Sequence, residues 1–117
     1  MDSLFREHSE KILIYIGREQ EEDAVENNVS VSMYNPVPID AIVSDLSFSK
    51  TAWAMPGKHA SKAKEILVEK KHQALLELSQ KIKIGADVYE GFRESGRIQS
   101  KVEGAYLRLF CYIEKYD

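Results

Sequence analysis

The chain has 117 residues, 44% of them hydrophobic and 30% charged, which fits one soluble domain with a modest core. Its formal net charge of −3 argues against a protein that mainly coats nucleic acid, although a local basic patch stays open. It carries no bilayer-length apolar run and no secretory signal, so we expect a cytosolic product without a membrane partner. Cys111 is the only cysteine, which excludes an internal disulfide and predicts a small buried side chain.

The first strand is predicted over residues 11–16. Three isoleucines alternate onto one face there, and β-branched residues suit a pleated surface. Residues 1–10 fit either one helical turn or an arm whose Leu4 and Phe5 dock on a neighbour. The sequence leaves both alternatives open.

A strongly acidic stretch follows over residues 18–28, with Arg18 as its only nearby cation. Such a density of like charge disfavours burial and predicts a solvated loop. A calcium loop is the alternative, but the stretch lacks the alternating oxygen ligands and central glycine of an EF-hand. Its carboxylates form a candidate subunit or partner interface: Glu19, Glu21, Glu22, Asp23 and Glu26.

Two more strands are predicted over residues 29–34 and 39–44, because apolar and polar residues alternate in both. Pro36 and Pro38 lie between them and remove two backbone donors, which indicates an edge or a sharp corner between sheets. Residues 45–51 are predicted to form a polar loop.

A short strand over residues 52–55 is predicted next, ended by Pro56 and Gly57. It contains Trp53, the only tryptophan. A core position is the favoured interpretation of this side chain. Packing against a partner is the alternative, because the residue lies beside a loop.

The pattern of residues 58–80 is ambiguous. We favour a strand over 64–69 followed by a short helix over about 72–79, with one continuous helix as the competing interpretation. The lysine side chains here either extend into solvent or contact an acidic surface or a phosphate backbone. They are Lys58, Lys62, Lys64, Lys70 and Lys71.

A β-hairpin is predicted over residues 79–92. Two isoleucines alternate with two lysines in its first half, Gly85, Ala86 and Asp87 favour a turn, and residues 88–90 resume an extended pattern.

The last strand is predicted over residues 106–113, and both of its faces are substantially apolar. One face carries Tyr106, Arg108, Phe110 and Tyr112. Either the strand is covered on both sides, or this aromatic face lies at a subunit contact. The elements together predict a mainly β fold, a small antiparallel β-barrel or sandwich with one short α-helix.

The sequence shows no catalytic signature and no cofactor or metal motif. His8, His59 and His72 have no ligand spacing, and no nucleophile elbow occurs. We therefore expect a protein that is not an enzyme and binds no cofactor.

The order of these elements resembles the small head-completion proteins of tailed bacteriophages, among them the head-closure or stopper proteins. The likeness rests on the succession Ser79-Gln-Lys-Ile-Lys-Ile84, Val88-Tyr89-Glu90 and the terminal Leu107-Arg108-Leu109-Phe110. It implies a structural virion protein made in the host cytoplasm: a small β-barrel in a homo-oligomeric ring of about twelve subunits. That ring would connect the portal and adaptor of the head to the tail, and its loops would face a channel through which DNA passes without specific recognition.

A second hypothesis is a small β-barrel module that binds a peptide or single-stranded nucleic acid. Its candidate aromatic contacts are Tyr34, Trp53, Phe110 and Tyr112, assisted by the lysines.

Overall fold

The computed structural model of the chain describes residues 3–16 and 36–114. The acidic loop and the strand predicted over residues 29–34 lie outside these ranges. The elements in chain order are α1 (Ser3–His8), β1 (Glu10–Ile16), β2 (Val37–Asp45), α2 (Phe48–Ala54), β3 (Ala60–Glu69), η1 (Lys70–His72), α3 (Gln73–Glu77), β4 (Ser79–Ile84), β5 (Asp87–Gly91), β6 (Arg93–Glu94), β7 (Arg97–Ile98), β8 (Ser100–Glu103) and β9 (Tyr106–Glu114).

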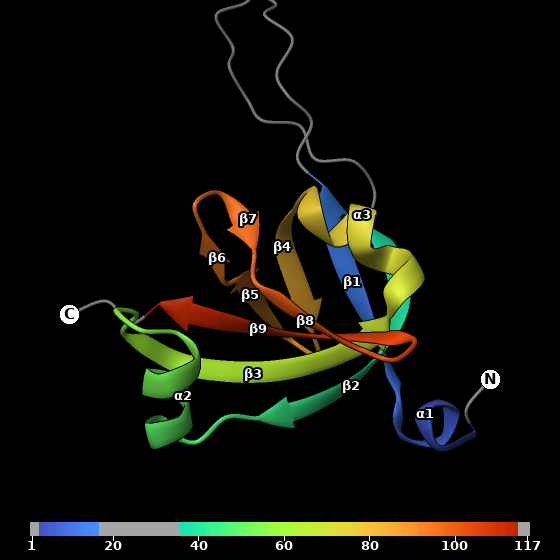
Figure 1. Ribbon diagram of the computed structural model, residues 1–117, viewed down its shortest axis with the longest axis horizontal. Helices are drawn as coiled ribbons and strands as arrows, with labels where there is room; N and C mark the ends of the chain where they lie inside the picture. Colours follow the sequence, from blue (N-terminus) through green and yellow to red (C-terminus); the bar gives the residue numbers. More distant parts are fainter. Residues whose placement is uncertain (1–2, 17–35, 115–117) are drawn as a thin grey trace, which may run out of the picture.

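Six antiparallel strands close into a barrel (Figure 1). Their order is β3-β2-β1-β4-β5-β9, and β9 returns to pair with β3. One edge of β9 pairs with β3 along its whole length, while its other edge pairs with β8 and then with β5. The predicted mainly β fold is therefore confirmed, in its barrel form.

The barrel encloses the main core because alternate residues of each strand point inward. Fully buried aliphatic side chains come from five strands: Ile12, Ile14, Ala41, Ile66, Val68, Ile82, Leu107 and Leu109. Each large aliphatic side chain removed from water contributes about 1.5–3 kcal/mol. Cys111 lies among them at 0% exposure, as expected, and Leu76 of α3 reaches the same core.

The most regular predictions are confirmed. β1, the β4–β5 hairpin and β9 match the predicted strands within a few residues, and the hairpin turns at Gly85, whose φ is 62°. The two-part interpretation of residues 58–80 also holds, since a strand is followed by η1 and α3. That strand begins earlier than predicted, at Ala60.

Pro36 precedes β2, and Pro38 lies near the start of β2, where the strand has only one neighbour. β2 sits between β1 and β3, but Pro38 is opposite Leu13 of β1, whereas β3 pairs with β2 only from Ala41 onward. The missing donor of Pro38 therefore falls where β2 has one strand neighbour.

The prediction of a strand over residues 52–55 is wrong, and so is the prediction of a loop over most of residues 45–51. Helix α2 occupies this stretch. Its N-cap is Ser47, whose hydroxyl accepts a hydrogen bond from Lys50 N at 3.2 Å and whose carbonyl accepts one from Thr51 N at 2.9 Å. These bonds satisfy donors and acceptors that a strand would leave to a neighbour, and Pro56 follows the helix end.

Candidate protein-binding surface

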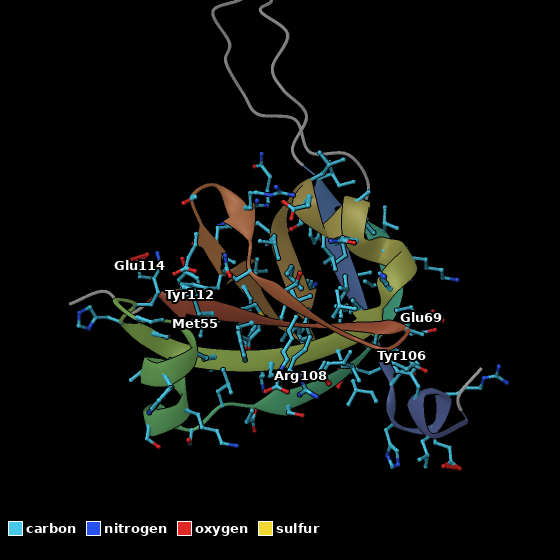
Figure 2. The ribbon with its side chains drawn as sticks, in the orientation of Figure 1. Met55, Glu69, Tyr106, Arg108, Tyr112 and Glu114 are labelled. Atoms are coloured by element: carbon cyan, nitrogen blue, oxygen red, sulfur yellow. The ribbon has the colours of Figure 1, made fainter. Side chains whose placement is uncertain are left out.

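A second, smaller core lies outside the barrel, where α2 covers the outer face of β3 and β9. It is formed by Met55, Ala63, Phe92 and Tyr112, all less than 9% exposed. Figure 2 shows Tyr112 beside Met55 at the end of β9 nearest α2. This packing fixes α2 on the barrel and determines which of its side chains face solvent.

Trp53 projects from α2 into solvent. It is 87% exposed, so the predicted core position is wrong. Only one side of α2 contacts the barrel, and Ala54 and Met55 occupy that side. The opposite side of the helix, which carries Trp53, therefore stays in water. Trp53 therefore presents the largest apolar side chain of the chain to water.

A hollow of about 340 Å³ adjoins Trp53 on the outer face of β8 and β9. We call it the Trp53 hollow. Its apolar wall includes Phe92 and Phe110, and its polar wall includes Lys101, Arg108 and the carboxylate Glu94. It thus joins α2, the β6 region, β8 and β9 in one concave surface with apolar and charged sides.

The polar wall of the hollow is held by an ion-pair cluster. Arg108 Nε donates to Glu103 Oε2 at 2.7 Å and Nη2 donates to Oε1 at 2.8 Å, while Nη1 donates to Glu65. All three side chains are about one quarter to one third exposed. Because both carboxylates already engage the guanidinium, Arg108 acts here as a fixed structural group.

Lys101 differs from Arg108 in its surroundings. Its side chain is exposed, and among residues 3–16 and 36–114 its ammonium group has no hydrogen-bond or ion-pair partner. Lys101 lies opposite Arg108 in the β8–β9 register, so both side chains emerge on the same outer face. It is the available cation at the hollow.

The outward aromatic residues of β9, predicted as one surface, are divided among three environments. Phe5 of α1 stacks on Tyr106, and Tyr112 is only 5% exposed. Phe110 alone of the three lines the hollow. The strand is thus covered on both faces over most of its length, which is the first of the two predicted alternatives.

The N-terminal residues follow the helical-turn alternative, as α1. Phe5 is 2% exposed and docks on its own barrel, not on a neighbour. Figure 2 places Tyr106 beside α1 and Arg108 farther along the same strand.

The predicted basic segment does not form one cationic face. Lys58 Nζ lies 5.1 Å from the Tyr112 ring centroid, and Lys71 Nζ lies 3.8 Å from Glu69 Oε1. Lys62 donates to Asp87 at 2.8 Å, a hydrogen bond that raises the pKa of its ammonium group. Lys64 donates to Asp45. Of the five candidates, Lys70 is exposed without a described ion pair, so charge alone does not single out this segment as an interface.

Sequence reasoning missed the hollow because it misplaced Trp53. The usable local signal was Ser47 three residues before Lys50, the spacing of a helix N-cap to the amide it accepts from. Phe92, Gln99 and Lys101 gave no local signal, because pairing among distant strands brings them together.

Within residues 3–16 and 36–114, no cluster of three or more histidine, cysteine or carboxylate side chains has the arrangement of a metal site. None of the helices described is long and apolar enough to cross a membrane. Comparison of the chain with protein families, curated proteins and solved structures found no match.

Proposed function

We propose that this protein is a structural assembly subunit that contacts neighbouring proteins through the Trp53 hollow. One observation carries the proposal: a tryptophan left 87% exposed beside a hollow with an apolar wall. Exposed tryptophans are uncommon on surfaces that stay in water, and they are enriched at the centres of protein interfaces. Covering Trp53 and Phe110 would remove apolar area from water at a preformed concave site.

We propose further that its place of assembly is the neck of a tailed bacteriophage, as the sequence resemblance implies. A small barrel carrying short surface helices suits a ring subunit, because the closed sheet is rigid and its exterior is free to vary. The ring would contain about twelve copies and bind portal or adaptor proteins on one side and tail proteins on the other. DNA would pass through its channel.

The test is assembly on purified phage heads that carry the portal but lack this protein. Native mass spectrometry and light scattering would measure the mass of the chain alone and the occupancy of the heads. We expect addition to the portal vertex and loss of occupancy in Trp53→Ser. The control is Val88→Ser, which removes a 46% exposed apolar side chain from β5, outside the hollow. Absence of binding to heads, or equal binding by Trp53→Ser, would contradict the proposal.

A binding module is the second candidate, and one observation narrows the class of ligand that it would bind. Base stacking needs accessible aromatic faces, and Tyr112 is buried, so Trp53 and Phe110 remain as the described candidates on one surface. This arrangement favours a peptide ligand over single-stranded nucleic acid. Salt-sensitive binding of the isolated chain to an oligonucleotide would reverse that preference.

A further inference from the structure

β8 has an open edge directly beside the Trp53 hollow. It pairs with β9 from Ser100↔Leu109 to Glu103↔Tyr106, and no other strand in the described ranges pairs with it. The barrel itself closes without it, through β3, β5 and β9. β8 therefore presents a strand edge that closure of the barrel leaves unsatisfied.

The hairpin geometry indicates which backbone groups face outward. Gly104 and Ala105 form a two-residue turn, and the flanking pair of such a hairpin is hydrogen-bonded. Since hydrogen-bonded and non-hydrogen-bonded pairs alternate, Ser100 and Val102 direct their N–H and C=O groups away from β9. These four groups can pair with a further strand.

We propose that β8 accepts an extended segment of another protein as an additional antiparallel strand. This inference deepens the proposed function by naming the kind of partner segment and the way it binds. Backbone hydrogen bonds to Ser100 and Val102 would hold the segment, and its outward side chains would meet the hollow. Side chains two residues apart share a face of a strand. One partner residue would therefore lie opposite Lys101, and the residue two positions from it would lie near the hollow.

Charge determines the chemistry of that segment. The partner residue opposite Lys101 would be Asp or Glu, because opposite charges at this position stabilise a strand pair. The partner strand would lie two strand spacings, about 10 Å, from β9, so only a long apolar or aromatic side chain two positions away would extend over β8 toward Phe110 and Trp53. The partner segment thus carries an acidic and a large apolar residue separated by one residue.

A second copy of β8 fits this edge less well. Antiparallel pairing of two β8 strands in the register that uses the outward N–H and C=O groups of both Ser100 and Val102 matches Ser100 with Val102. This register places the two Lys101 side chains directly opposite each other. Like charges in that position are destabilising. The surface therefore favours an acidic segment from a different protein.

The test selects ligands from a yeast-displayed library of random octapeptides and measures the affinity of an enriched, fluorescein-labelled peptide. We expect enrichment of acidic and large apolar residues at i and i+2. Val102→Pro removes an outward N–H without removing a bond to β9, so affinity should fall at least about tenfold. The control Val102→Thr keeps the N–H and should bind within about twofold. Lys101→Glu should reverse the charge preference of the selected peptides.

Amide hydrogen exchange on the unsubstituted protein gives a second measurement that does not depend on a variant folding. Saturating peptide should slow exchange at Ser100 and Val102. No enriched pattern, unchanged exchange at these amides, or equal binding by Val102→Pro would overturn the inference. Self-association abolished by Val102→Pro would also overturn it, in favour of a second copy. If Trp53→Ser prevents assembly on heads while Val102→Pro does not, the proposed function stands and this inference fails.

Discussion

Phe5 of α1 and Tyr106 of β9 stack with ring centroids 4.9 Å apart and an interplanar angle of 23°. This contact anchors the first helix to the strand that closes the barrel, about one hundred residues later in the chain. We expect Phe5→Ala to lower the free energy of unfolding by about 3 kcal/mol, because it leaves a cavity against Tyr106. Urea denaturation measures the change.

The matched control for Phe5 is Glu7→Ala on the same helix. Glu7 is exposed, so its replacement should stay within about 0.5 kcal/mol of the unsubstituted protein. Similar losses in both variants would show that the ring contact does not determine the effect.

Arg108→Gln should destabilise the protein by about 1 kcal/mol. The substitution leaves the Glu65 and Glu103 carboxylates partly buried without their cation, and solvent at this one-third exposed site reduces the cost below that of a buried pair. Chemical denaturation at low salt provides the measurement. Lys81→Gln, which breaks a more exposed 3.7 Å pair with Glu90, should change stability by less than about 0.5 kcal/mol. Equal effects would argue against a cooperative cluster.

Gly91→Ala should cost about 1–2 kcal/mol, because an added Cβ would lie 2.7 Å from Ile98 Cδ1. Ile98→Val removes that methyl group. A double-mutant cycle should therefore show a smaller penalty for Gly91→Ala in the Ile98→Val background. Additive losses would indicate that the contact with Ile98 does not oppose the substitution.

Cys111 should be inert in the folded protein. Burial raises the pKa of its thiol to about 12, so the thiolate required for alkylation is scarce near neutral pH. Iodoacetamide should react slowly with the native chain and rapidly in urea. Fast alkylation under native conditions would contradict the burial of this side chain.

The same raised pKa predicts lower stability in alkali. A cysteine in the unfolded chain ionises near pH 8.5, whereas in the fold it stays protonated to about pH 12, so stability falls as pH rises through this window. At pH 10 the loss from Cys111 is about 2 kcal/mol. Unfolding at pH 7 and pH 10 should show a smaller fall in Cys111→Ala, which also controls for the lysine pairs that weaken in alkali.

Trp53 should act as a fluorescence reporter of binding but not of folding. It is the only tryptophan and is already in water, so its emission wavelength should change little on unfolding. A blue shift should accompany covering of the hollow by a partner. Trp53→Ser should keep the unfolding free energy within about 0.5 kcal/mol. A large blue shift of the free folded chain relative to the unfolded one would contradict the exposed position.

Local patterns predicted the barrel strands well, because burial on one face imposes alternation on the sequence itself. The β4–β5 hairpin and β9 show this directly: Ile82, Ile84, Leu107 and Leu109 recur at every second position and all point inward. Trp53 was misplaced because four residues with alternating size fit a strand and a helical turn equally well, and the Ser47 cap outside that window decided between them.

The hollow and the β8 edge depend on pairing that no local window contains. Arg108 donates to Glu65, 43 residues earlier in the chain, only because β3 and β9 are neighbours in the sheet. The open edge of β8 likewise follows from β5 and β8 sharing one side of β9. Such relationships require the register of distant strands, which alternation alone leaves undetermined.

The position of β9 also constrains synthesis. A nascent chain interrupted before Tyr106 would leave β3, β5 and β8 without the strand that each of them pairs with, and their backbone groups would be exposed to other chains. Ribosome-bound intermediates up to that point should therefore need protection from aggregation, and cooperative closure should begin once residues 106–114 emerge.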